Sequence, residues 1–340
     1  MIVTVCSVRQ LPQALLLGES VVRHSPPADE PPFVIGLADD PARLPAGLTI
    51  PHPIIAVGDL LPADELARLS AQYTPTEFAA AVKPLLIRAV FRRFPAAGVV
   101  IYADPNVLFY GPVAHIAEQL AGATALLTPH LLRAPQDGAW PDEKAFQNVG
   151  LYSADFLAFR RSAETDRLLA WWQDRVQPRA FVDFCAGLCT DGLWLMHVPV
   201  FFRDVQIVKN PAWHLALWNA HERNLHRQPD GGWQVSRTDE PATAARPLLF
   251  VNFRGLANPD DGFFAHQNRL RLADRPDLQT LLADYRRAPA HYERSDLRLV
   301  RPAYGEQPEP AVLRGWRYRT TRALRRVVRW IEHVPLPARR

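Results

Sequence analysis

The sequence predicts an α/β protein, a sheet with helices on both faces, and three observations support this prediction. Apolar runs of strand length alternate with segments whose apolar residues recur at helical spacing. Hydrophobic residues make up 48% of the chain and charged residues 22%, which is typical of a globular protein with a real core. No apolar stretch reaches the roughly 18 residues that a membrane span requires. The N-terminus lacks the basic start and apolar stretch of a signal peptide, so we expect a cytoplasmic protein.

The alternation can be followed along the first half of the chain. Short apolar or β-branched runs predict buried strands, because a strand covered on both faces is apolar throughout. Apolar residues three and four positions apart predict the helices between them. The expected strands are residues 1–7, 33–38, 99–103 and 125–128, and the expected helices are residues 12–22, 62–94 and 113–121. Prolines predict breaks in the long helix at 74–75 and 83–84.

The second half continues the pattern after an interruption. Residues 135–143 are rich in Pro, Asp and Gly and predict a loop that lies over a site. Residues 156–159 predict a strand, and residues 162–176 predict a helix that Ser162 caps. A further strand begins at Leu249 and ends on polar residues. These segments complete the expected sheet.

The formal charge of +4 hides an asymmetry between the body of the chain and its C-terminus. Residues 314–340 contain nine arginines and one glutamate, so residues 1–313 carry a formal charge of −4. A nucleic-acid-binding surface needs basic residues spread over one face of the fold. We therefore expect no nucleic-acid partner.

The cysteines and two missing motifs exclude further classes of protein. Cys6, Cys185 and Cys189 are too few for a disulfide framework and lack a second cluster for zinc. We expect Cys185 and Cys189 to be buried thiols. The sequence has neither a P-loop nor a G-x-G-x-x-G fingerprint, which argues against P-loop and simple dinucleotide-binding proteins.

Three polar residues stand at the ends of predicted strands: Ser7, Asp40 and Asp104. In an open α/β sheet, ligands bind beyond the carboxyl ends of the strands, so these residues are candidates for a site. Asp104 and Asn106 offer two oxygen ligands to Mg²⁺ or Mn²⁺, ions that often take further ligands from substrate phosphates. An ordinary Asp-Pro turn after a strand is the alternative.

Three further segments carry candidate residues. Asp191 precedes a glycine, which is also typical of a turn. Residues 213–223 hold two tryptophans, two histidines and an asparagine, a composition that suits a sugar-binding surface or tryptophans packed in the core. Arg254 follows the strand that begins at Leu249. Its guanidinium can bind a phosphate through two hydrogen bonds or form an ion pair at the surface.

In their order and spacing, these segments resemble bacterial GT-A-type nucleotide-diphospho-sugar transferases, distantly similar to retaining glycogenin-like and lipopolysaccharide galactosyl transferases. The resemblance covers about residues 1–287, and the segments that carry it are TVCSVRQLPQALLLGESVVRHSP, AVKP, IYADPNVLFYGPV, LTPHLL, GLYSADFLAFRRSAETDRLLAWW, DGLWLMHVPVFF, NPAWHLALWNAHERNL, LLFVNFRG and NRLRLADRPDLQTLLADY. It implies a GT-A-like Rossmann-type α/β/α sandwich with a mixed, mostly parallel sheet. Such a fold binds a nucleotide sugar, usually with Mn²⁺.

The resemblance also implies roles for single residues. Ser7 and Asp40 would lie near the nucleotide base and ribose, and Lys83 near the diphosphate. Asp104 matches the first Asp of the family's D-x-D metal motif, and Asp191 matches the Asp of a D-Q pair beside the sugar. Trp218-Asn219 match the family's W-N pair. The expected substrate-binding residues are Ser7, Asp40, Lys83, Asp104, His214, Trp218, Asn219 and Arg254.

The chain departs from the family pattern at several of these positions. Asn106 replaces the second Asp of D-x-D, and Asn252 replaces a histidine ligand. With Asp104 as the remaining carboxylate ligand, we expect Mn²⁺ or Mg²⁺ to be weakly bound or dispensable. Arg254 replaces a serine and adds a positive charge that can stabilise a departing diphosphate in place of a metal. Gly192 replaces the Gln of D-Q, and His214 replaces an Asn.

Two functions remain open. The first is a glycosyltransferase that moves a sugar from a nucleotide donor, expected to be a UDP-sugar, to a glycan or lipid-linked acceptor. Its catalytic residue would be Asp191 or Asp155, which is new in the family's Y-N-x-G-F motif and would stabilise positive charge at the anomeric carbon. The second is a degenerate, non-catalytic member that only binds a nucleotide or a glycan. Convergence of Asp155, His214 and Arg254 on one pocket would favour the enzyme.

The C-terminus is expected to form a separate part of the protein. We predict a nucleotide-sugar-binding domain over residues 1–290 and a basic extension over 291–340. From Leu313 onward, apolar residues recur every three or four positions with arginines between them, which predicts an amphipathic helix. Such a helix can lie on an anionic membrane, here the inner face, beside a lipid-linked acceptor. Packing of its apolar side on the acidic body is the alternative.

Overall fold

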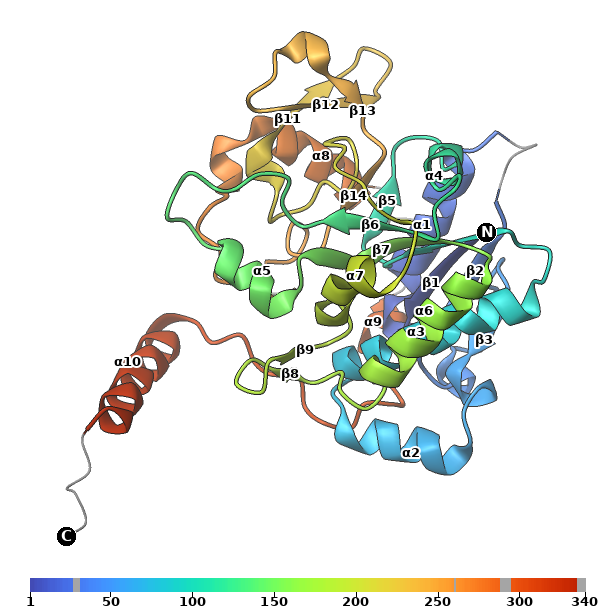
Figure 1. The fold of residues 1–340 in the computed structure, drawn as a ribbon, viewed down its shortest axis with the longest axis horizontal. Helices are drawn as coiled ribbons and strands as arrows, with labels where there is room; N and C mark the ends of the chain where they lie inside the picture. Colours follow the sequence, from blue (N-terminus) through green and yellow to red (C-terminus); the bar gives the residue numbers. More distant parts are fainter. Residues whose placement is uncertain (27–30, 260, 288–294, 335–340) are drawn as a thin grey trace. The chain divides into compact units, whose positions relative to one another are not determined.

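The computed structural model describes residues 1–26, 31–259, 261–287 and 295–334. A seven-stranded mixed sheet forms its centre (Figure 1). The strand order is β10 (Val205–Ile207), β6 (Ala125–Pro129), β7 (Tyr152–Arg160), β4 (Val99–Ala103), β1 (Ile2–Cys6), β2 (Phe33–Leu37) and β3 (Ile54–Ala56). Only β7 runs antiparallel to its neighbours, so among the described strands the sheet is mixed and mostly parallel, as the sequence predicted.

Apolar cores cover both faces of this sheet. Along β1, Ile2 and Cys6 belong to one core, whereas Val3 and Val5 belong to the other, as the alternation of side chains along a strand requires. Helix α1 (Leu11–Arg23) packs into the first core. Helices α2 (Ala63–Gln72), α3 (Pro75–Arg93) and α6 (Ala163–Val176) pack into the second.

The helix expected over residues 62–94 is in fact two helices. α3 begins with a capping box in which the Thr74 hydroxyl accepts from the Glu77 backbone and the Glu77 carboxylate accepts from the Thr74 backbone. The break predicted at 74–75 is therefore confirmed. The break predicted at 83–84 is wrong, because α3 continues through Pro84. An interior proline costs about 3 kcal/mol, and burial of Val82, Leu85 and most other residues on both sides offsets it.

Three small sheets extend the fold beyond the central one. β5 (Val107–Phe109) pairs with β14 (Phe250–Asn252), and β8 (Val182–Asp183) pairs with β9 (Leu188–Cys189). β11 (Arg223–Arg227), β12 (Trp233–Arg237) and β13 (Arg246–Pro247) form the third sheet. Cys189 is buried as expected, but Cys185 is exposed because it lies in the turn between β8 and β9.

The remaining helices are short apart from two. They are α4 (Ala114–Gln119), α5 (Glu143–Val149), α7 (Val198–Phe201), α8 (Pro276–Arg287) and α9 (Ser295–Leu299), together with α10 (Gly315–Glu332). Most of the loop predicted at 135–143 is irregular, and α5 begins at its last residue.

The chain divides into two compact units, Met1–Pro308 and Glu309–Arg340. The boundary predicted between 290 and 291 falls on residues outside the described ones. The first unit extends to 308 because the segment after α9 is hydrogen-bonded to it. The Glu306 amide donates to the Ser70 carbonyl at 2.8 Å, and the Gln307 amide donates to the Tyr73 carbonyl at 2.9 Å.

The second unit consists mainly of α10. Its apolar residues, Trp316, Leu324, Val327, Val328 and Ile331, recur at the predicted helical spacing, with arginines between them. Within this helix no side chain is buried. Among the described residues, no helix combines the length and the apolarity that crossing a membrane requires.

Candidate functional site

Strand pairing brings four distant segments together beyond the carboxyl end of β4. Because β7 runs antiparallel to β4, the amide of Asp104 donates to the carbonyl of Asp155 at 2.8 Å. The pairing of β14 with β5 places Asn252 opposite Val107. A segment that contains His214 runs beside β14. The backbone amide of Asn252 donates to the carbonyl of Leu215 at 2.8 Å. We call Asp104, Asp155, His214, Asn252 and Arg254 the Arg254 cluster.

Arg254 lies between the two carboxylates of this cluster. Its Nη2 is 2.6 Å from Oδ2 of Asp104, and its Nη1 is 3.6 Å from Oδ1 of Asp155. The Arg254 side chain is 22% exposed, against 7% for Asp104 and 13% for Asp155, so it is the most open of the three. A Cβ at Gly262 would lie 3.2 Å from the Arg254 stem, so the following loop packs closely on it. The guanidinium is thus held in place.

A chain of hydrogen bonds links Asp155 to the interior of the sheet. Asn252 Nδ2 donates to Asp155 Oδ2 at 2.7 Å and lies 3.5 Å from Nε2 of His214. On the other side of the imidazole, Nδ1 is 2.7 Å from the hydroxyl of Thr128. Burial lowers the pKa of His214 to about 3, so the ring is neutral at physiological pH. Thr128 was not among the predicted site residues, because the sequence marks it only by its place in the strand that became β6.

Lys83 and Asp191 form a buried ion pair next to this chain. Lys83 Nζ is 2.5 Å from Asp191 Oδ2, and their side chains are only 8% and 6% exposed. The same ammonium donates to the carbonyl of Ala154 at 3.0 Å and lies 4.8 Å from the centre of the Tyr102 ring. Lys83 therefore anchors α3 to the residue that precedes Asp155.

The two carboxyls beside Arg254 have pKa values that move in opposite directions. Burial raises the pKa of Asp104 to about 6, and the charge of Asp155 adds to this rise. Burial also acts to raise the pKa of Asp155, but Arg254 and Lys83 outweigh it and hold that pKa below its usual value. Asp155 is therefore the carboxylate that stays ionised over the wider pH range.

The positions that match the family's metal motif do not fit a divalent ion in this structure. Asp104 Oδ1 accepts from the backbone and the side-chain amide of Asn106 at 3.0 and 2.9 Å, while Oδ2 faces Arg254. The Asn252 amide donates to Asp155, and its oxygen accepts from the Arg254 backbone at 2.9 Å. In the part of the chain that the structure describes, no three His, Cys, Asp or Glu side chains are grouped to hold a metal.

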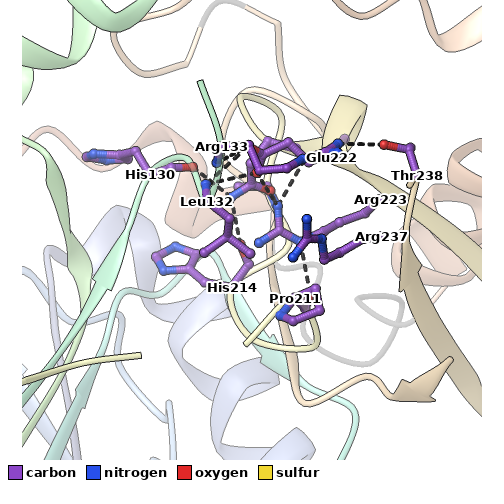
Figure 2. Close-up of polar contacts among 12 residues, drawn as sticks. His130, Leu132, Arg133, Pro211, His214, Glu222, Arg223, Arg237 and Thr238 are labelled. Carbon is purple, nitrogen blue, oxygen red and sulfur yellow. Dashed lines mark hydrogen bonds and ion pairs between the residues drawn. The ribbon is translucent and has the colours of Figure 1, made fainter. Parts of the chain in front are cut away.

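The segment with the W-N pair is built on a second, fully buried ion pair, shown in Figure 2. Glu222 and Arg223 lie 3.2 Å apart with side chains 3% and 1% exposed. The Glu222 carboxylate accepts from the amides of Leu132 and Arg133, and Arg223 Nε donates to the carbonyl of Pro211 at 2.9 Å. These bonds tie residues 211–223 to the segment after β6.

Asn219 serves this segment rather than a solvent-exposed surface. Its Nδ2 donates to the carbonyls of His130 and His214 at 3.1 and 3.0 Å, and its Oδ1 accepts from the Ala216 amide at 2.9 Å. Trp218 is 5% exposed and packs against the rings of His130 and His214. Its Nε1 has no hydrogen-bond partner among the described residues. This donor of Trp218 is thus buried and unsatisfied, unlike the side-chain amide of Asn219.

Ser7 and Asp40 lie at the ends of β1 and β2, and their side chains bond to their own segments rather than to the Arg254 cluster. The Ser7 hydroxyl is 3.3 Å from Oε1 of Gln10, and the Asp40 carboxylate caps the short helix that follows it. The neighbouring Asp39, which was not among the predicted site residues, is fully buried. It accepts from the amides of Val8, Asp40 and Ala303 at 3.0, 2.9 and 2.8 Å.

No model of a known protein family matches the chain. The chain is 23% identical over 252 residues to the uncharacterized protein YfnF of Bacillus subtilis strain 168, covering 74% of this chain and 80% of that protein.

Among solved structures, the chain is similar to glycosyltransferases. One is the galactosyltransferase LgtC in complex with donor and acceptor sugar analogs, at 16% identity and a TM-score of 0.47, covering 84% of this chain and 95% of LgtC. Another is the bifunctional glycosyltransferase WbbM, at 11% identity and a TM-score of 0.46, covering 87% of this chain and 50% of WbbM.

Proposed function

We propose that the Arg254 cluster is the active site of a glycosyltransferase that moves a sugar from a UDP-sugar to a glycan or lipid-linked acceptor. One observation carries the proposal. Asp155, His214 and Arg254, three residues at which the sequence departs from the family pattern, lie in one cluster with the retained Asp104. A remodelled working site requires these residues to lie together, and their mutual hydrogen bonds and ion pairs support that proposal.

The chemistry of the cluster suits transfer from a diphosphate. In the reaction, the bond between the anomeric carbon and the phosphate oxygen breaks, and its electron pair leaves with UDP. The acceptor hydroxyl forms the new bond and gives its proton to the released diphosphate. Positive charge develops on the sugar ring during this step, and a buried carboxylate stabilises it strongly. Asp155 suits that role because its pKa is lowered, and Asp191, which pairs with Lys83, is the second candidate carboxylate.

Two neutral groups are placed to recognise the sugar. The neutral His214 adds a polar ring without adding charge. The Trp218 ring packs against that imidazole, and its buried Nε1 has no partner in the described part of the chain, so a sugar hydroxyl that displaces the packing over it can accept from it. Asn219 contributes indirectly, because it holds the backbone of His214.

Non-catalytic binding is the second candidate, and one observation favours it. The backbone of Ala303 donates to Asp39, so the chain itself occupies a carboxylate at the end of β2, close to the predicted nucleotide region. Calorimetry with UDP and with GDP tests both candidates. We expect UDP to bind more tightly than GDP. If neither binds at millimolar concentration, both candidates are wrong.

We propose in addition that α10 attaches the protein to an anionic membrane surface, where a lipid-linked acceptor would be found. Its exposed tryptophans and aliphatic residues suit the interfacial region of a bilayer. Each basic residue near such a surface contributes about 1 kcal/mol. The arginines of α10 are exposed and available for this contact.

A further inference from the structure

We infer that the guanidinium of Arg254 takes the place of a divalent ion, so that the donor diphosphate is bound without a metal. The inference rests on the proposed function and specifies its cofactor requirement. The side chains at the positions that match a metal motif form hydrogen bonds with their neighbours in the cluster instead of leaving their oxygens free for an ion.

The charged residues of the Arg254 cluster suit a singly charged guanidinium better than a divalent ion. A divalent ion is usually balanced by carboxylates, and the change to Asn at 106 removes one of them. The remaining carboxylate of the motif, Asp104, faces Arg254 at 2.6 Å, and Asp155 faces it from the other side at 3.6 Å. Asp104 Oδ1 is meanwhile saturated by two donors from Asn106. The residues thus form a complete set around a guanidinium.

Arg254 remains charged under all practical conditions. A guanidinium stays protonated in proteins, and the carboxylates of Asp104 and Asp155 beside it favour its charged form. The backbone amide of Arg254 donates to Asn252 Oδ1, and the Gly262 turn packs on its stem, so the cation needs little reorganisation to act.

Arg254 also has donors left for a ligand. A guanidinium carries five N–H groups in a planar fork. Nη2 donates to Asp104, and Nη1 lies 3.6 Å from Asp155, beyond hydrogen-bond distance, so N–H groups of both Nη atoms are left for a ligand, whereas Nε is buried. Because this side chain is the most exposed of the three, an incoming diphosphate reaches it before the carboxylates. Hydrogen bonds from a charged guanidinium to a phosphate are stronger than hydrogen bonds between neutral groups.

The test compares UDP binding in EDTA with UDP binding in Mn²⁺, by calorimetry on the full chain. For the wild-type protein we expect the two dissociation constants to agree within about twofold. Arg254→Ala should weaken UDP binding by about 10- to 100-fold in EDTA, since hydrogen bonds to charged groups contribute about 1.5–3 kcal/mol. Arg237→Ala is the matched control, because it removes an arginine that pairs with Asp239 at the surface.

A second measurement uses Mn²⁺ itself as the probe. Electron paramagnetic resonance should detect no Mn²⁺ bound by the wild-type protein. The triple variant N106D/N252H/R254S restores the family's ligand types and should bind Mn²⁺, with UDP affinity that now depends on the metal. Wild-type UDP binding that requires Mn²⁺ would overturn the inference and leave the proposed function intact. Absence of UDP binding under both conditions would instead overturn the proposed function. The wild-type measurements need no variant, so a variant that fails to fold does not affect them.

Discussion

The ion pair between Lys83 and Asp191 shows how much depends on single residues in this fold. Both side chains are almost completely buried, and the resemblance placed them at the diphosphate and beside the sugar. A buried charge is tolerated only while its partner is present, because desolvation of an unpaired charge is costly. Lys83 therefore supports the site by pairing with Asp191, whether or not it touches the donor.

We expect Lys83→Met to lower the free energy of unfolding by about 3–5 kcal/mol, because it leaves Asp191 buried without a counter-charge. The double variant K83M/D191L should recover most of that loss. Denaturant unfolding of the three proteins measures both effects. A single variant within about 1 kcal/mol of the wild type would contradict the stabilising role of the pair.

Two buried histidines predict how stability depends on pH. Burial lowers the pKa of His130 to about 4 and that of His214 to about 3, whereas both titrate near 6.5 when unfolded. The unfolded state therefore binds more protons as the pH falls below 6.5, and stability declines. His130→Asn should reduce the loss between pH 7 and pH 5 by about 2 kcal/mol. Unfolding curves at the two pH values test this, and an unchanged loss would contradict it.

At the scale of elements, the sequence predicted the strands better than their pairing. Apolar runs located β1, β2, β4 and β6 because buried strands are apolar throughout. Nothing local indicated that β5 pairs with β14, since that pairing joins segments far apart in the chain. Thr128 and Asp39 were missed for the same reason: each acquires its role from a distant partner. The helix-breaking effect of Pro84 was overestimated. Burial of the residues around it offsets the preference of proline to end a helix, and α3 continues through it.

The hydrogen bonds of Asn219 are expected to stabilise the segment 211–223. Asn219→Ala removes the partner of two carbonyls and one amide, all buried. The free energy of unfolding should fall by about 2–3 kcal/mol, since each unsatisfied group carries a desolvation cost. Denaturant unfolding measures the change, and Asn224→Ala is the matched control because that asparagine lies on the exposed side of β11. Equal effects of the two changes would show that Asn219 does not tie the segment together.

At the scale of the whole molecule, charge is divided unevenly. Residues 314–340 have a formal charge of +8, and the rest of the chain has a formal charge of −4. The sequence predicted the amphipathic helix correctly, because periodicity is a local property. What the helix binds is a matter of long-range contacts, and the membrane attachment stays a prediction.

Vesicle co-sedimentation tests that attachment. The full chain should sediment with anionic vesicles but not with neutral ones, and added salt should weaken the binding because it screens the arginines. A chain truncated after Pro310 should stay in the supernatant. Full-length protein that remains in the supernatant at low salt would rule out the membrane contact.

The central claim, that the Arg254 cluster transfers a sugar, is tested most directly by the release of UDP from a panel of UDP-sugars. The wild-type protein should release UDP from at least one donor in the presence of EDTA. Asp155→Asn should slow that release by about 100-fold or more, because it removes the carboxylate that stabilises the sugar cation. Release from no donor, or equal rates for wild type and variant, would contradict the account.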